Sequence, residues 1–169
     1  MKRFLFVFIL LAGLCFQVDA QQKFGHLNSS QLLTEMPEIK AANTNLETYQ
    51  KQLMSKGQKM LTDLQTKVQA YRQEYESGAL SALQAQQKET EIQTDNEAIR
   101  QYEIDMQQKV AAKRETLYKP LLDKVKAAIE KVGKENGYTM IFDTSIPGAI
   151  VHAQMSDDIT ALIKAELGL

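Results

Sequence analysis

The side chains that most often carry enzyme chemistry are few and scattered in this chain of 169 residues. It has two histidines, His26 and His152, and a single cysteine, Cys15. Each histidine lies in or beside a segment expected to be a strand, and neither has zinc-type ligand spacing around it. We interpret both as partly exposed strand residues, and a metal or catalytic pair is the less favoured alternative.

The hydroxyl and carboxyl groups give no stronger signal. Ser29 and Ser30 have no neighbouring base, and we expect them to cap a helix. Asp143, Asp157 and Asp158 form a small acidic set, but the D-x-[DN]-x-[DN]-G loop of calcium sites is missing. The chain also lacks a P-loop and a dinucleotide-binding fingerprint. The sequence therefore predicts no cofactor, no metal site and no enzymatic activity.

The first twenty residues have the pattern of a cleavable secretory signal peptide. Lys2 and Arg3 precede an apolar run at residues 4–16, which is too short for a membrane span. Small residues before position 21 predict cleavage after Ala20, which would also remove Cys15. Lipid attachment at Cys15 is a weaker alternative, because Leu14 precedes it where a small residue is expected. The signal predicts export from the cytoplasm.

Charge excludes one class of partner. The whole chain has a formal net charge of −1. Removal of residues 1–20 takes away Lys2, Arg3 and Asp19, so the mature chain carries 18 basic and 20 acidic residues, a net charge of −2. Proteins that bind nucleic acid are usually basic, and export argues against such a partner as well.

Residues 37 to about 132 are predicted to form two long helices that run out and back around a turn at Ser77 and Gly78. Apolar or small residues recur in an 11-residue repeat, about 3.67 residues per turn, which suits a nearly straight helical pair. The outgoing helix carries them at Leu46, Tyr49, Leu53, Gly57, Met60, Leu64, Val68, Tyr71 and Tyr75, and the returning helix at Ile99, Tyr102, Met106, Val110, Leu117, Leu121, Ala128 and Val132. A run of roughly 38 residues reaches about 57 Å, so the pair should project as an arm from a body.

The remaining segments are expected to form that body. The first part of the body spans residues 21–36 and contains a strand at 23–28 and a short helix. The arm follows at residues 37–118. The rest of the body spans residues 119–169. Pro120 should kink the returning helix. Residues 138–143 alternate like a strand, and a turn should pair them as a hairpin with a second strand at 149–153. Ser156 or Asp157 should cap a last helix, which gives an α+β fold that is predominantly α.

Three short strands make a small core for a chain of this length. We therefore expect other copies of the chain to complete the body. The residues expected in this oligomeric body are Phe24, Leu27, Tyr138, Met140, Phe142, Ile150 and Val151.

Tyrosine and methionine side chains along the arm have two interpretations. At seam positions they are expected to pack the two helices together. Some of them could instead line a surface that receives apolar segments of a client, since methionine-rich surfaces adapt to many partners. The residues concerned are Tyr49, Met54, Met60, Tyr71, Tyr75, Tyr102 and Met106.

The order of these elements resembles the Skp/OmpH family of periplasmic chaperones. The resemblance is carried by the strand ending in Leu27-Asn28, the run at 137–143, the segment 150–153 and the run Asp158-Ile159-Thr160. It implies a jellyfish-shaped homotrimer in which three helical arms project from a small β body and enclose a cavity. It also implies an ATP-independent holdase that keeps unfolded outer-membrane β-barrel proteins from aggregating on their way to the outer membrane.

One region departs from the family. Its better-known members have basic arm tips, whereas residues 77–100 here contain two basic and four acidic side chains. This argues against electrostatic capture at the tip and against the lipopolysaccharide or peripheral lipid contact that the resemblance implies. A competing hypothesis is an adaptor or structural coiled-coil protein of the envelope that binds one folded partner. It would favour a sharply defined patch on the arm, which the sequence does not show.

Overall fold

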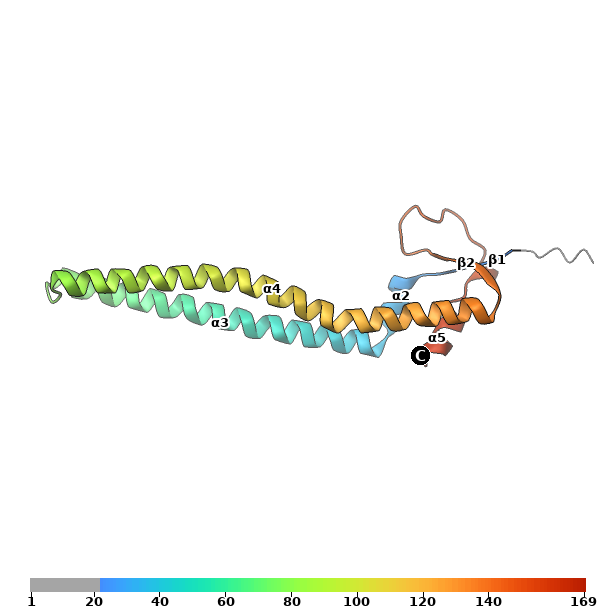
Figure 1. Ribbon diagram of the computed structural model, residues 1–169, viewed down its shortest axis with the longest axis horizontal. Coiled ribbons are helices and arrows are strands. Elements are labelled where there is room, and N and C mark those ends of the chain that lie inside the picture. Colours follow the sequence, from blue (N-terminus) through green and yellow to red (C-terminus); the bar gives the residue numbers. More distant parts are fainter. Residues whose placement is uncertain (1–21) are drawn as a thin grey trace, which may run out of the picture.

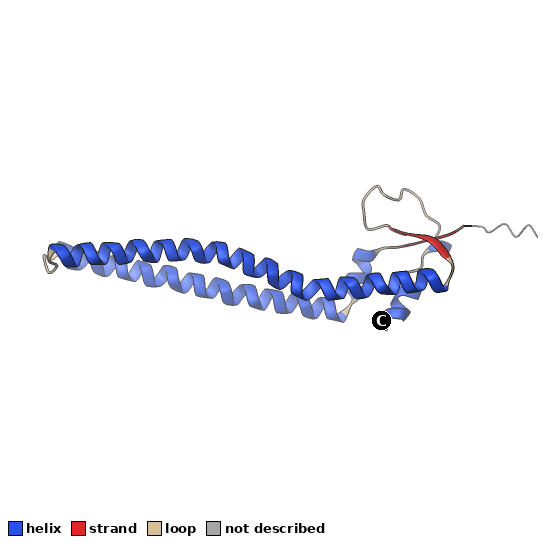
Figure 2. Ribbon diagram, in the orientation of Figure 1, coloured by secondary structure: helices blue, strands red, loops and turns tan. Residues whose placement is uncertain are grey.

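The computed structural model describes residues 22–169, so the predicted signal peptide, its cleavage after Ala20, and Cys15 lie outside the described residues. Figure 1 shows a slender two-helix arm that projects from a small body, and Figure 2 shows that both strands belong to the body. The elements follow in the order β1 (Lys23–Leu27), α2 (Ser29–Glu35), α3 (Pro37–Glu76), α4 (Ala82–Glu135), β2 (Tyr138–Asp143), a 3₁₀ turn η1 (Met155–Asp157) and α5 (Thr160–Leu167). None of the helices in this part of the chain is both long and apolar enough to span a membrane.

The arm turns where the sequence predicts. Helix α3 ends before Ser77, and Gly78 follows with φ of 70°, a left-handed conformation that glycine adopts without strain. Ser81 and Gln84 then form a capping box that starts α4, in which the Ser81 amide donates to Gln84 Oε1 over 2.9 Å. With 40 residues, α3 extends about 60 Å.

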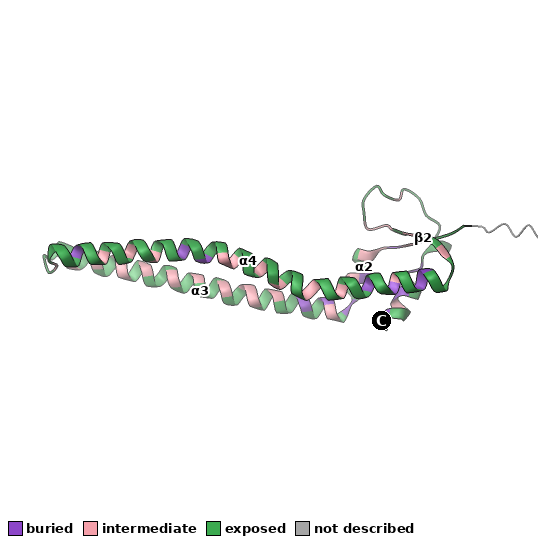
Figure 3. Cartoon of the chain, in the orientation of Figure 1, coloured by how far each residue is buried: buried purple, intermediate pink, exposed green. Residues whose placement is uncertain are grey.

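A single seam joins the two helices. The repeat positions of α3 from Leu46 to Tyr71 are half-buried, whereas Tyr75 near the tip is exposed. Figure 3 shows exposed residues over most of the arm, with buried and half-buried positions interspersed along both helices. On α4, the best-buried seam residues are Ile99 and Tyr102. A two-helix arm therefore buries one stripe of each helix and leaves its flanks open.

The helices approach closely at Gly57. A Cβ atom at this position would lie 3.3 Å from Cε1 of the Tyr102 ring, so the ring packs against the glycine backbone. The Tyr102 hydroxyl donates to the carbonyl oxygen of Leu53 over 2.9 Å. Glycine weakens an exposed helix, but here it makes room for the largest buried side chain of the seam.

The core of the body lies where α2, α5, β1 and the last turns of α4 meet. Its buried side chains are aliphatic or methionine and come from segments far apart in sequence. They are Leu27, Leu32, Met36, Ile39, Val125, Ala128, Val132, Ile159, Ile163 and Leu167. Tyr118 and Leu121 of α4 pack against this core as partly buried residues.

The two strands are parallel, and the entire arm is the connection between them. Parallel strands need a long crossover, which α3 and α4 supply. On the other edge of β1, His26 forms a bridge with Asp158, and the Ile159 amide donates to the His26 carbonyl oxygen over 2.9 Å. Strand β1 is therefore central, and the second edge of β2 has no partner strand within the described chain.

The predicted hairpin is wrong. Residues 149–153 form no strand, and β2 pairs with β1 instead. Directly after β2, the Thr144 amide donates to the Leu27 carbonyl oxygen over 2.8 Å, so the chain stays beside β1 for one more residue. Residues 144–154 then form a projecting loop, seen beside β2 in Figure 1, in which Val151 is 96% exposed.

Two caps also differ from the prediction. Asn28 caps α2, since its Oδ1 accepts from the Gln31 amide over 2.9 Å. At the start of α5 the side chain that binds a free amide is that of Asp158, not Ser156 or Asp157. Its carboxylate accepts a hydrogen bond from the Thr160 amide over 2.8 Å. In both cases the side chain that lies just outside the first helical turn is the one within reach of its free amides.

Asp143 joins the end of β2 to the start of α2. Its carboxylate accepts from the Ser29 amide over 3.1 Å, from the Ser29 hydroxyl over 2.5 Å and from the Ser145 amide over 2.9 Å. Burial raises the pKa of Asp143, but the hydrogen bonds from Ser29 and Ser145 outweigh it and hold the pKa below its ordinary value. The sequence placed Asp143 in a small acidic set with Asp157 and Asp158 and did not indicate this partner.

Pro120 lies within α4 and cannot donate to the carbonyl of Thr116. Figure 1 shows α4 changing direction between the arm and the body. The helix nevertheless continues to Glu135, so a single helix belongs to both the arm and the body.

We predict that Asp143→Asn lowers the free energy of unfolding by about 1–2 kcal/mol at pH 7, because charged hydrogen bonds to Ser29 and Ser145 are lost. The folded pKa is depressed, so this stabilisation is complete above the unfolded pKa and is lost as the pH falls through the folded value. Denaturant unfolding at pH 7 and at pH 3 should show a difference from wild type that shrinks at pH 3. Asp157→Asn, which alters an exposed residue of η1, is the control, and an equal loss for both variants would contradict the role of Asp143.

Candidate functional site

One flank of the arm carries a shallow groove next to the seam. Its upper part, of about 530 Å³, is lined by Gln50, Met54, Met106, Gln107, Val110, Ala111 and Arg114. Its lower part, of about 470 Å³, is lined by Ala111, Arg114, Glu115, Tyr118, Lys119, Leu122 and Asp123. The two parts share Ala111 and Arg114, and together we call them the apolar groove.

Helical spacing places these residues in line. Gln107, Ala111, Tyr118 and Leu122 recur at steps of four or seven along α4 and so form one stripe beside the seam. The small side chain of Ala111 leaves a hollow at the centre. Met54 from α3 borders that hollow and is 63% exposed. The groove therefore offers hydrocarbon surface that no other part of the described chain covers.

Six of the twelve lining residues are glutamine or charged, and Lys119 and Asp123 pair with each other over 3.0 Å. The Arg114 guanidinium lies 5.8 Å from the centre of the Tyr118 ring, a cation–π distance. The Tyr118 hydroxyl donates to Asn43 Oδ1, which fixes the ring against α3. Flexible methionine side chains at Met54 and Met106 adapt to different shapes. Such a surface suits apolar side chains in many orientations and gives no means of activating a bond.

A second apolar surface lies on the body. Phe24, Met140 and Phe142 are exposed on the outer face of the two-stranded sheet, and the rings of Phe24 and Phe142 lie 6.2 Å apart. We call these three residues the apolar sheet face. In the loop that follows β2, the exposed apolar residues are Ile146, Val151 and Met155.

The metal-ligating side chains among the described residues are scattered. No group of three or more histidine, cysteine, aspartate or glutamate residues among residues 22–169 could hold a metal ion. His26 contacts the carbonyl oxygen of Gln154 through Nε2 over 2.9 Å, and His152 is exposed in the loop. The structure thus does not bring the two histidines together with other metal-ligating groups.

Comparison with known proteins identifies the fold. The family model described as outer membrane protein, OmpH-like, matches residues 23–167. The chain belongs to the OmpH-like family. Membership confirms the predicted family, supports a chaperone role in the periplasm, and agrees with the expectation that the protein is not an enzyme.

Two relatives extend this result. An uncharacterized protein of Aquifex aeolicus (strain VF5) is 28% identical over 167 residues, covering 99% of this chain and 96% of its own length. A crystal structure of an OmpH-like chain from Caulobacter crescentus CB15, described as an outer membrane chaperone, superposes with a TM-score of 0.75 at 18% identity. The match covers 88% of this chain and 85% of that one. This second likeness is one of fold, and it confirms the arm and the small β body.

The predicted client-binding residues fall in several places on this OmpH-like chain. Met54 and Met106 line the apolar groove. Tyr49 lies in a separate hollow with Lys113, and Met60 lines a third hollow near Asp95. Tyr102 is only 8% exposed, so its place is in the seam.

The groove contains residues that the sequence analysis did not propose as binding residues, notably Ala111, Tyr118 and Leu122. Their spacing beside the seam was a usable signal, but a stripe of mixed polar and apolar residues is common on exposed helices. In the body, the structure places Leu27 in the subunit core, and Tyr138 and Ile150 are half-buried. Phe24, Met140, Phe142 and Val151 are the predicted body residues that face outward.

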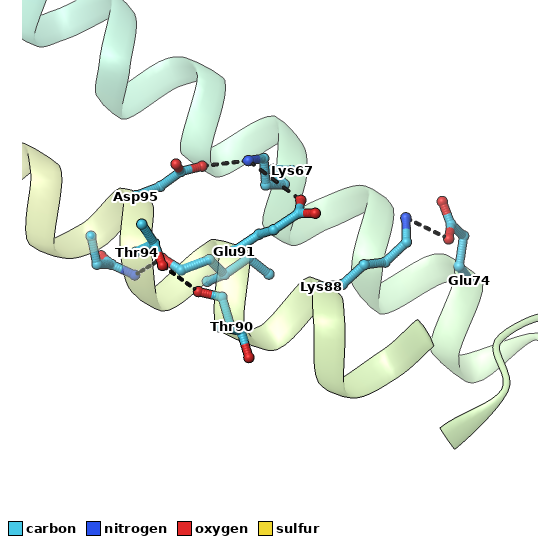
Figure 4. A network of polar contacts seen from close by, with 9 residues as sticks. Lys67, Glu74, Lys88, Thr90, Glu91, Thr94 and Asp95 are labelled. Carbon is cyan, nitrogen blue, oxygen red and sulfur yellow. Dashed lines mark hydrogen bonds and ion pairs between the residues drawn. The ribbon is translucent and has the colours of Figure 1, made fainter. Parts of the chain in front are cut away.

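Polar contacts across the seam hold the arm tip together (Figure 4). Lys67 pairs with Asp95 over 2.5 Å and with Glu91 over 3.8 Å, and Lys88 pairs with Glu74 over 2.8 Å. The hydrogen bond with Asp95 is the main cause of a raised pKa at Lys67. Several acidic groups of the tip are therefore engaged in contacts within the arm.

Tyr71 belongs to the same part of the arm, and its hydroxyl donates to Glu89 Oε1 over 2.5 Å. This hydrogen bond is the main cause that raises the pKa of Tyr71 to about 12. We predict that Glu89→Gln returns one tyrosine to the ordinary pKa near 10, visible in an absorbance titration at alkaline pH. Glu91→Gln should leave that titration unchanged, and an equal effect of both variants would contradict the contact.

Proposed function

We propose that this chain is an ATP-independent holdase of the periplasm, which binds unfolded outer-membrane β-barrel proteins and prevents their aggregation. Family membership and the description of the Caulobacter chain as an outer membrane chaperone support the client class. The observation that carries the proposal is the apolar groove, an open hydrocarbon surface on a slender arm.

The groove matches the length of one client strand. From Gln107 to Leu122 it follows α4 for 15 residue steps, about 22 Å. An extended chain covers that distance with about seven residues, of which every second one in a barrel strand is apolar. About three client side chains would then contact the groove at once. Such segments aggregate readily when they are left exposed, so covering them has a clear benefit.

Release without a nucleotide follows from weak contacts. The groove is shallow and provides few directed polar partners, so each client side chain is held loosely. Several such sites around one client would raise its overall affinity through high local concentration. Folding at the outer membrane could then remove the client, because a closed barrel no longer presents unpaired strands.

We further propose that three copies assemble through the apolar sheet face and enclose a cavity between their arms. Exposed contiguous apolar surface on a small body is typical of an interaction site. The unpaired edge of β2 lies next to this face and offers backbone donors and acceptors to another copy. Residues 149–153 contain the β-branched pair Ile150 and Val151 but have no partner strand within the subunit, which fits pairing with a neighbouring copy.

The adaptor hypothesis makes a different demand. A single folded partner would need a fixed set of polar contacts, and the groove offers mainly adaptable hydrocarbon. Mass-resolved sizing of the mature protein, alone and with an unfolded barrel protein, separates the two. A trimer that binds the unfolded barrel but not its folded form supports the holdase, whereas a stable complex with one folded protein supports the adaptor.

We predict that Ala111→Glu weakens suppression of barrel-protein aggregation by about fivefold, roughly 1 kcal/mol, because it places a charge at the centre of the groove. Light scattering after dilution of the barrel protein from urea measures the chaperone concentration needed. Ala112→Glu is the matched control, since it adds the same charge to the next exposed residue of α4, outside the groove. Equal losses in both variants would exclude the groove as the binding surface.

We also predict that Phe142→Glu shifts the mature protein from trimer to monomer in sedimentation velocity at micromolar concentration, because it places a charge in the apolar sheet face. Leu83→Glu, which alters an exposed leucine at the arm tip, should leave the trimer intact. The trimer proposal fails if Phe142→Glu sediments like wild type while the wild-type protein is itself oligomeric.

A further inference from the structure

Three lysines lie on the flank of the arm opposite the apolar groove. The Nζ atoms of Lys56 and Lys109 are 5.3 Å and 6.0 Å from the centre of the Tyr102 ring, and that of Lys113 is 5.8 Å from the Tyr49 ring. We call Lys56, Lys109 and Lys113 the lysine trio. Tyrosine rings attract these cations weakly, but they do not neutralise them.

The 11-residue repeat explains why these lysines lack acidic partners. Lys67 follows Lys56 by one repeat and pairs across the seam with Glu91 and Asp95. Because the helices are antiparallel, the residues that face Lys56 are those one repeat after Glu91 and Asp95. These are Tyr102 and Met106, so the same position of the repeat has carboxylates near the tip and none in the middle of the arm.

Other charged groups on this flank do not change the balance. Asp105 lies one turn before Lys109 and accepts a hydrogen bond from the side-chain Nε2 of Gln101 over 2.8 Å. Among residues 22–169, no member of the lysine trio is within ion-pair distance of a carboxylate. Three cations and one carboxylate leave this part of the arm positive, although the whole chain is slightly acidic.

A polar hollow of about 630 Å³ adjoins Lys113 on the same flank. It is lined by Ala41, Thr44, Asn45, Thr48, Tyr49, Gln52 and Lys113. The Thr44 and Thr48 hydroxyls already donate to the carbonyl oxygens of Lys40 and Thr44, so they can only accept from a client backbone, whereas the side-chain amides of Asn45 and Gln52 can both donate and accept. The lining includes no large aliphatic side chain that would enter a lipid bilayer, so a peptide fits this surface better than a membrane does.

We infer that the lysine trio and the adjoining hollow form a second client subsite, which binds carboxylate-bearing stretches of an unfolded polypeptide. The inference rests on the proposed holdase function and adds a charge preference to it. Barrel strands are joined by polar turns and loops, where aspartate and glutamate are common. The groove would then hold the apolar strand residues and the trio the acidic residues that flank them.

Three-fold assembly would bring the two subsites together. Rotation about a three-fold axis sets one flank of each arm against the opposite flank of the next arm. A client between two arms would meet the apolar groove of one copy and the lysine trio of its neighbour. This arrangement gives an alternating apolar and acidic chain two matched surfaces without requiring it to wrap around a single arm.

The test uses the mature full-length protein and two fluorescent 30-residue peptides, one alternating valine with glutamate and one with glutamine in place of glutamate. The trio variant Lys56→Gln, Lys109→Gln, Lys113→Gln is compared with Lys51→Gln, Lys126→Gln, Lys134→Gln. The control removes the same charge from exposed lysines elsewhere on α3 and α4. Circular dichroism and sedimentation check that both variants fold and assemble like wild type.

We expect the trio variant to bind the glutamate peptide about tenfold more weakly, since each exposed charge contact contributes a factor of about two. Its binding should lose most of its salt dependence, while binding of the glutamine peptide stays within twofold of wild type. The control variant should match wild type for both peptides.

Equal weakening by both variants would overturn the subsite, because general charge would then explain it. Loss of binding to vesicles of anionic phospholipid, with no change for either peptide, would also overturn it in favour of a lipid headgroup. If wild type binds neither peptide nor unfolded barrel protein, the proposed holdase function itself fails. If wild type and the trio variant bind both peptides equally, only the charge preference fails.

Discussion

Two antiparallel helices can bury only the stripe along which they touch, and this limit shapes most of the molecule. The α3 side of the seam from Leu46 to Tyr71 is half-buried, and the buried ring of Tyr102 on α4 depends on the missing side chain of Gly57. Everything beside the seam is free to serve another purpose. An ordinary globular domain of the same length would use that surface to close its own core. This chain instead leaves an apolar flank and a basic flank along the arm.

The topology gives the arm its anchorage. Strands β1 and β2 are parallel neighbours, and the whole arm is the crossover between them. Both ends of the arm must therefore return to the same small sheet, where Asp143 links the end of β2 to the start of α2. The ten buried side chains of the core fix α4 against α5 and α2. A firm base and a slender tip suit the proposed holdase, whose arms would accommodate clients of different sizes.

Charge is distributed along the arm in a way that net composition hides. At the tip, cross-seam pairs such as Lys67 with Asp95 hold the two helices together without a wide apolar contact (Figure 4). Such exposed pairs add little to stability individually, but they specify which residues face each other. One repeat further toward the body, aromatic and thioether side chains replace the carboxylates and the lysines are left unpaired. The same backbone repeat thus gives a tip paired with itself and a middle section whose lysines lie on the proposed second client subsite.

Local pattern was sufficient to predict several features. The 11-residue spacing gave the seam, Ser77 and Gly78 gave the turn, and the order of strand, arm and C-terminal elements gave the family and the fold class. The seam and the turn depend on residues close together in the chain, where periodicity and glycine conformation act directly, and the order of the elements follows from reading such local signals one after another. Expectations about the signal peptide concern residues outside those that the structure describes, and they stay predictions.

Tertiary structure decided the rest. Ile150 and Val151 predicted a strand at 149–153, but a strand needs a partner edge, and β1 rather than this segment pairs with β2. Likewise, the partner of Ser29 is Asp143, 114 residues away, which no local pattern could reveal. The apolar groove includes Met54 of α3 and Ala111 of α4, which are neighbours only because of the register between the two helices. Sequence alone specified the helical repeat because it is local, whereas pairing between distant segments set the sheet, the cap and the binding surface.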